Sequence, residues 1–333
     1  MSELPELVQS LLSPEAYPEA VASVDLVQTQ MSFVFLTGDY VYKVKKPVDL
    51  GYLDYTTLEK RLFYCQREVE LNGRLCPGVY LGVVPLTRKA GRIVVGGEGE
   101  TIEYAVRMRY LPQEAMLDSL LVKNQVSPEM LTVVAQKLAE FHRKAATSDA
   151  ISAFGEVAAI KVNTDENFSQ TEAYISRTIS AKQYRCIKDY TNSFLKDNVS
   201  LFRQRVGEGR IKDCHGDLHA AHVCFTDSVC IYDCIEFNDR FRYGDVASEI
   251  ALLAMDLDRY GRADLSASFV ADYVAFSRDE DLDRLLNFYK CYRAYVRGKV
   301  VGFKLDDPYV PEGEKEKALA AVRRYFALAE SYL

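Results

Sequence analysis

Residues 213–223 read DCHGDLHAAHV, and residues 229–237 follow with VCIYDCIEF. The first stretch holds three of the four histidines of the 333-residue chain. Asp217 lies between a glycine and an apolar residue, so we expect a tight loop to present its carboxylate. Asp233 ends an apolar strand, where a carboxylate costs free energy unless it binds a cation. The two carboxylates predict a magnesium–phosphate site, because Mg²⁺ uses one or two carboxylates together with substrate phosphates.

A zinc site is the alternative use of the histidine cluster. Its ligands would be nitrogen and sulfur atoms of neighbouring side chains: His215, His219, His222 and either Cys214 or Cys224. The spacing H-x3-H-x2-H matches no common zinc pattern. A zinc site also leaves Asp217, in the middle of the cluster, without a role. We therefore favour the magnesium–phosphate interpretation.

Before residue 112 the sequence predicts a sheet and one helix. Residues 24–46 predict strands with a hairpin turn at Thr37-Gly38-Asp39, and glycine-rich turns separate further strands up to residue 111. Residues 56–75 carry apolar side chains at helical spacing behind a threonine cap. We expect about five strands and one helix in residues 24–111.

Apolar and basic residues alternate in the strand that ends before Pro47. Successive side chains of a strand point to opposite faces, so Val41, Lys43 and Lys45 share one face. Taken alone, each lysine is an ordinary solvated residue of an edge strand.

From Pro112 onward the chain is mostly helical. Helical patterns cover residues 128–146, 165–205, 245–303 and 313–333, while residues 209–243 predict short strands and loops around the histidine cluster. The composition change at Pro112 predicts a hinge between a lobe of residues 1–111 and a lobe of residues 112–333. The predicted fold class is α+β.

Composition excludes several kinds of protein. Lys and Arg number 41 against 48 Asp and Glu, and the net charge of −7 argues against a nonspecific nucleic-acid binder. No apolar run reaches the length of a membrane span, and Glu3 and Glu6 stand where a signal peptide carries basic residues. We therefore expect a cytoplasmic protein without a membrane partner, whose eight cysteines are reduced thiols.

These stretches together resemble the catalytic core of the aminoglycoside phosphotransferase-like kinases, relatives of the protein kinases. The matching segments are YKVKKPVDLGYLDYTTLEKR, VRMRYLP, HGDLHAAHV, DCIEFNDRFRYGDVASEIA and YRAYVRGKV. The chain is most similar to a group of bacterial kinases in which such a domain is often fused to a P-loop ATPase domain. The resemblance implies a bilobal protein kinase-like fold, with a small antiparallel-sheet lobe that binds nucleotide and a larger helical lobe.

The resemblance also implies roles for single residues. Asp217 would be the catalytic base, and Asp233 would bind the Mg²⁺ that bridges the ATP phosphates. Lys43 would pair with the α- and β-phosphates, with Lys45 as its rival. Glu68 would hold that lysine from the helix, with Glu70 as its rival.

The remaining implied positions concern adenine, the phosphate loop and a second metal ligand. Arg109, Tyr110 and Leu111 would form the hinge whose backbone binds adenine. Ser32 and neighbouring amides would cover the phosphates, because no glycine-rich loop is present. His222 stands where the family has an asparagine metal ligand, and Glu236 would support the metal.

The predicted function is ATP-dependent transfer of the γ-phosphate to a hydroxyl of a small molecule, such as an aminoglycoside, a sugar or an amino alcohol. The predicted cofactors are ATP and Mg²⁺, with Mn²⁺ as an alternative because of His222. The chain contains no G-x-x-x-x-G-K-[ST] motif, so a P-loop ATPase partner would be a separate chain. The alternative is a non-catalytic nucleotide-binding module of the same fold. A protein kinase is disfavoured, because nothing between Asp233 and Asp245 resembles an activation loop.

Overall fold

The computed structural model describes residues 4–308 and 310–333. In this part of the chain two compact units form. The first holds the residues up to Met116 together with His222–Asp239, and the second holds Leu117–Ala221 and Arg240–Leu333. This division differs from the single predicted boundary at residues 111/112, because the segment that carries Asp233 packs with the N-terminal sheet.

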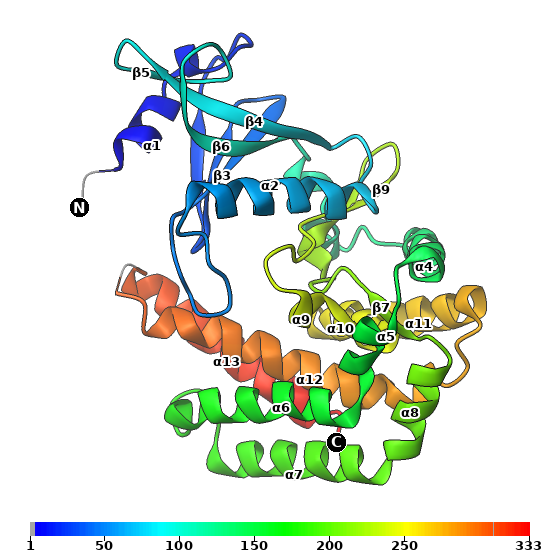
Figure 1. Ribbon diagram of the computed structural model, residues 1–333. Helices are drawn as coiled ribbons and strands as arrows, with labels where there is room; N and C mark the ends of the chain where they lie inside the picture. Colours follow the sequence, from blue (N-terminus) through cyan, green and yellow to red (C-terminus); the bar gives the residue numbers. More distant parts are fainter. Residues whose placement is uncertain (1–3, 309) are drawn as a thin grey trace. The chain divides into compact units, whose positions relative to one another are not determined.

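An antiparallel sheet of six strands forms the centre of the first unit (Figure 1). The strands are β1 (Asp25–Gln28), β2 (Ser32–Leu36), β3 (Tyr40–Lys45), β4 (Tyr80–Lys89), β5 (Arg92–Val95) and β6 (Glu100–Arg109). Their order is β1-β2-β3-β6-β4-β5, so β3 is an interior strand rather than an edge. The pairing of Leu36 with Val41 confirms the predicted hairpin, where Gly38 takes a φ of +91° that glycine adopts without strain.

A different helix packs on each face of this sheet. The helices are α1 (Glu6–Leu11) and α2 (Leu58–Gly73). Tyr42 of β3 lies in one apolar cluster with residues of α1, and Val41 lies in another with Cys65 of α2. Alternation along β3 therefore turns Lys43 and Lys45, which share the face of Val41, toward α2.

A short hairpin of β8 (Val223–Phe225) and β9 (Val229–Ile231) completes the first unit. The Cys234 amide donates to Asn72 Oδ1 at the end of α2, at 2.9 Å. A disulfide joins Cys76, just after α2, to Cys230 of β9. The expectation of reduced thiols is therefore wrong for this pair, because folding brings together two cysteines that lie 154 residues apart in the sequence.

The second unit is mainly helical (Figure 1). Its helices are α3 (Leu117–Val122), α4 (Pro128–Lys144), α5 (Asp149–Ser152), α6 (Val157–Thr171), α7 (Ala181–Asp197), α8 (Val199–Gly207), α10 (Val246–Arg259), α11 (Ala263–Ser277), α12 (Leu282–Gly302) and α13 (Glu312–Glu330), with α9 (Asp239–Arg242) at its border with the first unit. Short 3-10 helices occupy Pro14–Ala16, Gln113–Ala115, Ala153–Gly155, Glu172–Tyr174, Ala220–His222 and Phe303–Leu305. A two-stranded sheet of β7 (Ile211–Asp213) and β10 (Tyr243–Asp245) leads into the segment that holds Asp217.

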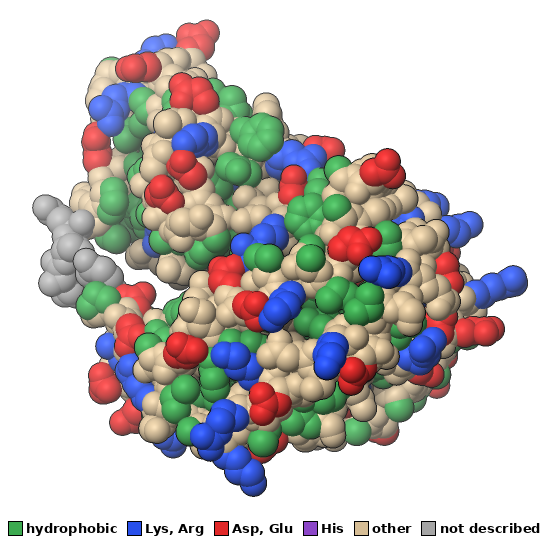
Figure 2. Space-filling view, turned by 60° about the horizontal axis from the view of Figure 1, so that its bottom comes forward, with side chains coloured by type: hydrophobic (Ala, Val, Ile, Leu, Met, Phe, Trp, Pro, Cys, Tyr) green, Lys and Arg blue, Asp and Glu red, His purple; other side chains and the backbone are tan. Residues whose placement is uncertain are grey.

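Among the described residues, no helix combines the length and the apolar character that crossing a membrane requires. Figure 2 shows acidic and basic side chains interspersed over the visible face, without a large patch of one sign. Such a mixture fits the small net charge of the chain.

Candidate active site

Two lysines of β3 share one glutamate of α2. Lys43 Nζ lies 2.8 Å from Glu68 Oε1, and Lys45 Nζ lies 2.7 Å from Glu68 Oε2. The Glu68 side chain is fully buried, whereas the rival residue Glu70 pairs with Arg67 in an exposed position. The structure therefore brings the predicted helix carboxylate, Glu68, to both candidate lysines.

The other contacts of the two lysines separate their roles. Lys43 Nζ donates to Asp233 Oδ1 at 2.7 Å, and the Lys43 side chain keeps 18% of its surface exposed. Lys45 is 1% exposed and is bound on its other side by Glu236 Oε1, with which it forms a short ion pair. Lys43 therefore lies next to the predicted metal ligand, whereas Lys45 is locked in the interior.

Glu236 is held inward by two donors. Besides Lys45, the Tyr55 hydroxyl donates to Glu236 Oε1 at 2.7 Å. Glu236 is 7% exposed, so the structure places this carboxylate as an anchor for Lys45. We call Lys43, Lys45, Glu68, Asp233 and Glu236 the lysine cluster.

Asp233 has an unusual backbone conformation. Its φ is +60°, the left-handed region that is uncommon for residues other than glycine. The Asp233 amide donates to the buried hydroxyl of Tyr80 at 3.2 Å. The Asp233 carboxylate is 41% exposed, and its Oδ2 lies 3.6 Å from His222 Nε2. The predicted metal ligands Asp233 and His222 thus lie side by side.

Attraction within the cluster outweighs the effect of burial on the pKa of Lys43, Lys45 and Glu68. Burial lowers the pKa of Lys43, but Asp233 and Glu68 outweigh this and hold that pKa well above its ordinary value. Burial likewise lowers the pKa of Lys45, and Glu236 and Glu68 reverse the effect. Burial raises the pKa of Glu68, but the two lysines bring it below its ordinary value.

In the second unit, Asp217 lies on a loop that one buried carboxylate holds by its backbone. We call residues 214–219 the HGD loop. Glu249 Oε1 of α10 accepts hydrogen bonds from the amides of His215 at 2.8 Å and Gly216 at 2.7 Å. Gly216 has a φ of +92°, which permits the sharp turn before Asp217.

The second oxygen of Glu249 is also occupied. His142 Nε2 of α4 lies 2.7 Å from Glu249 Oε2, and His142 Nδ1 lies 2.7 Å from the Tyr273 hydroxyl. Burial alone would raise the pKa of Glu249, but the hydrogen bonds from His142 and Gly216 lower it to about 2. His142 is thus a buried helix histidine that supports the HGD loop.

The Asp217 carboxylate, 31% exposed, faces two basic side chains of the second unit. Asp217 Oδ1 lies 3.6 Å from Arg297 Nη1, and Asp217 Oδ2 lies 3.4 Å from His219 Nε2. Arg293 Nη1 donates to the Gly216 carbonyl at 3.3 Å. Partial exposure leaves Asp217 accessible to a hydroxyl group, with cationic side chains nearby.

The predicted adenine hinge lies directly after β6. The Arg109 amide donates to the Val79 carbonyl and the Tyr110 amide to the Asp39 carbonyl, both at 2.9 Å. The described residues offer no such partner to the Leu111 amide. Ser32, at the start of β2, is 2% exposed, and its amide donates to Thr29 Oγ1 at 2.9 Å.

The sequence analysis missed three residues that build this site. Tyr55 and Tyr80 support the lysine cluster, but neither stood out among the 22 tyrosines of the chain. Glu249 had a usable signal: it is a lone carboxylate in the apolar stretch VASEIALLAM, where only a buried partner would offset its desolvation.

No family model matches the chain. The chain is 35% identical over 301 residues to the uncharacterized proteins Rv2004c of Mycobacterium tuberculosis and Mb2027c of Mycobacterium bovis. The match covers 90% of this chain and 58% of each mycobacterial protein. The chain therefore spans little more than half the length of these curated relatives.

Solved structures of similar fold come from small-molecule kinase families. A candidate aminoglycoside phosphotransferase from Ralstonia eutropha superposes with a TM-score of 0.53 at 13% identity, with 98% of both chains covered. A choline/ethanolamine kinase family protein from Mesorhizobium loti gives a TM-score of 0.51 at 13% identity, with 93% of both chains covered. The chain has a protein kinase-like fold. An ethanolamine kinase of Plasmodium vivax gives 0.50 at 10% identity, covering 92% of this chain and 81% of that one. The predicted α+β, kinase-like fold class is thus confirmed.

Proposed function

We propose that this protein is a kinase of the aminoglycoside phosphotransferase type that transfers the γ-phosphate of ATP to a hydroxyl of a small molecule in the cytoplasm. The observation that carries the proposal is the Lys43–Glu68–Asp233 arrangement. A strand lysine bound to a helix glutamate, next to a partly exposed aspartate, is the arrangement by which kinases hold ATP phosphates and their metal.

The lysine cluster fits a magnesium nucleotide. It contains three carboxylates and two ammonium groups, so its charge is negative before a cation binds. Asp233 is its most exposed carboxylate and offers the oxygen ligand that Mg²⁺ prefers. The nitrogen of His222 beside it suits Mn²⁺ better. When bound, the metal ion would neutralise charge on the transferring phosphoryl group.

Lys43, rather than Lys45, is the lysine we assign to the phosphates. Lys43 is partly exposed and can exchange Asp233 for a phosphate oxygen while it keeps Glu68. The same move by Lys45 would take it from two buried carboxylates, and Glu236 would keep only the Tyr55 hydroxyl as its partner.

Asp217 would accept the proton of the attacking hydroxyl. Its backbone is held by the Glu249 contacts, so its carboxylate is positioned before substrate binds. Transfer would depend on positioning and charge stabilisation, as is general for phosphoryl transfer.

The test is an assay of nucleotide binding, ATP hydrolysis and transfer, run with Mg²⁺ and with Mn²⁺. The acceptors are a panel of amino alcohols, sugars and aminoglycosides, with product detected by ³¹P NMR. The variants are Asp217→Asn and Lys43→Met, and the matched controls are Asp227→Asn and Lys89→Met at exposed positions. We expect Lys43→Met to weaken nucleotide binding and Asp217→Asn to abolish transfer, with both controls active.

Two results would contradict the proposal. Nucleotide binding without hydrolysis or transfer under either metal would favour the non-catalytic nucleotide-binding module. No nucleotide binding at all would exclude both functions.

A further inference from the structure

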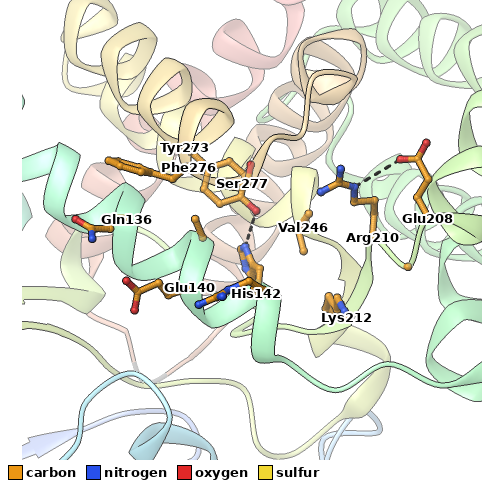
Figure 3. A pocket seen from close by; sticks show the side chains of 13 residues that line it. Gln136, Glu140, His142, Glu208, Arg210, Lys212, Val246, Tyr273, Phe276 and Ser277 are labelled. Carbon is orange, nitrogen blue, oxygen red and sulfur yellow. Dashed lines mark hydrogen bonds and ion pairs between the residues drawn. The ribbon is translucent and has the colours of Figure 1, made fainter.

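A cavity of about 450 Å³ lies within the second unit, away from the predicted active-site residues, none of which lines it. It is bordered by α4, α11, β7 and the turn between α8 and β7 (Figure 3). Its volume is that of a small-molecule site. The side chains used below are Arg143, Arg210, Lys212, Glu208, Phe276 and Ser277.

Basic groups outnumber acidic ones around this cavity. Arg143, Arg210 and Lys212 line it together with Glu140 and Glu208. Glu208 Oε2 lies 3.6 Å from Arg210 Nε, so one acid is already matched by one base. Arg143 and Lys212 form no ion pair within residues 4–308 and 310–333. The cavity therefore has an excess of positive charge.

Two polar atoms of the cavity wall are buried without a hydrogen-bond partner among the described residues. They are Arg210 Nε and Ser277 Oγ. Asp279 lies 3.9 Å from Arg210 Nε, too far for a hydrogen bond, and its carboxylate oxygens accept from Arg205 instead. Both atoms have almost no accessible surface, so a ligand in the cavity does not reach them. The Arg210 side chain as a whole is 26% exposed, and an oxyanion accepts from a guanidinium and from an ammonium group.

Part of the cavity wall is apolar. Phe276 is 46% exposed, and Val246 and Tyr273 complete this side. An exposed phenyl ring beside basic groups fits a ligand that joins an anionic head to an apolar body.

A chain of hydrogen bonds connects this wall to the HGD loop. Figure 3 shows the Tyr273 hydroxyl directed at His142. His142 binds Glu249, which accepts from the amides of His215 and Gly216. A ligand that packs on Tyr273 and His142 therefore contacts the hydrogen-bond chain that holds the loop carrying Asp217.

We propose that this cavity is a second ligand site, which binds a small organic anion with its oxyanion at Arg210 and Lys212 and its apolar part against Phe276. Occupancy stabilises the Tyr273–His142–Glu249 chain and thereby the backbone of the HGD loop.

Binding is tested by saturation-transfer NMR on the full chain with benzoate, phenyl phosphate, inorganic phosphate and, as the uncharged probe, benzyl alcohol. We expect saturable binding of benzoate or phenyl phosphate. Benzyl alcohol, which lacks the anionic group, and inorganic phosphate, which lacks the apolar group, should bind more weakly. Arg210→Gln and Lys212→Gln should each weaken binding about tenfold. The matched control Arg203→Gln, an exposed residue of α8, should leave it within twofold.

The proposal fails if neither aromatic anion binds saturably, or if both variants bind like wild type. It also fails if Lys43→Met abolishes binding and Arg210→Gln does not, since the probe would then occupy the predicted nucleotide site. A binding preference for phenyl phosphate over benzoate would assign the site to phosphate esters, and the reverse to carboxylates.

The connection to the loop is tested by amide hydrogen exchange, which needs no catalytic activity. Saturating benzoate should slow exchange at His215 and Gly216. His142→Phe removes the connection but leaves the Arg210 side intact, so this variant should bind benzoate without slowing loop exchange. Unchanged loop exchange in the benzoate-saturated wild type would overturn the coupling, and the proposed kinase activity would be unaffected by that result.

Discussion

The lysine cluster and the HGD loop hold their functional groups in opposite ways. In the lysine cluster, charged side chains are held by ion pairs with one another. Lys43, for example, forms ion pairs with Glu68 and Asp233. In the HGD loop, one carboxylate, Glu249, holds backbone amides and leaves the Asp217 side chain partly exposed. In the first region, ion pairs between side chains define where each charged group lies, whereas in the second, hydrogen bonds to the backbone define where the loop lies.

The largest expected effect is a loss of transfer activity when the carboxylate on the HGD loop is replaced. Asp217→Asn removes the proposed proton acceptor but keeps the loop backbone, because Glu249 contacts only amides of the loop. We expect kcat for transfer to fall about a thousandfold, with the KM for ATP within twofold. Steady-state kinetics measure both, and thermal unfolding should match the wild type. A decrease in kcat of less than tenfold would show that Asp217 is not the catalytic base.

The second prediction tests whether Lys45 contributes more to the stability of the fold than Lys43 does. Lys45→Met leaves Glu68 and Glu236 buried with one partner fewer, so the free energy of unfolding should fall by about 3–5 kcal/mol. Lys43→Met should cost about 1 kcal/mol, because Glu68 keeps Lys45 as its partner and Asp233 is exposed enough for water to solvate it. Urea unfolding at pH 7 measures both changes. Equal losses would show that the two lysines are structurally equivalent.

The third prediction concerns pH and the buried carboxylate of the HGD loop. The folded pKa of Glu249 is about 2, below its ordinary value of 4.5, so its ionised form stabilises the fold above pH 4.5. This contribution is lost as the pH falls from 4.5 toward 2 and amounts to about 3 kcal/mol. The stability difference between wild type and Glu249→Gln should be constant above pH 5 and shrink below pH 4.5. Parallel urea-unfolding curves down to pH 2.5 would contradict the assigned cause.

The smallest predicted effect tests whether Tyr55 only supports the lysine cluster from behind. Tyr55→Phe removes one hydrogen bond to Glu236, which keeps Lys45 as its partner. We expect a loss of about 1 kcal/mol in the free energy of unfolding and no change in nucleotide affinity. Calorimetry and nucleotide titration report the two quantities. A loss in affinity would place Tyr55 in the nucleotide site rather than behind it.

Much of the fold was predictable because its signals are local. Alternation along β3, the hairpin at Gly38 and the helical spacing of α2 each depend on a few neighbouring residues. The predicted count of about five strands is close to the six that the sheet contains. The unit boundary was not predictable, since the attachment of residues 222–239 depends on contacts with the distant end of α2.

For the candidate site, sequence and resemblance together named Lys43, Glu68 and Asp233, which the structure brings into direct contact. They left Lys43 and Lys45 as rivals, because both lie on the same face of one strand. Glu236 contacts Lys45 and Tyr55, and its support of the metal stays a prediction. Glu249 was not singled out, because its partners come from α4 and the HGD loop, more than thirty residues away in sequence.

Local sequence alone therefore accounts for the strands, the helices and the loop aspartates, since backbone preferences and side-chain periodicity act over a few residues. Tertiary structure decides which lysine is buried, which glutamate pairs with it and what holds the HGD loop. The physical reason is that the stability of a charge depends on burial and on partners, and both are supplied by segments far apart in the chain.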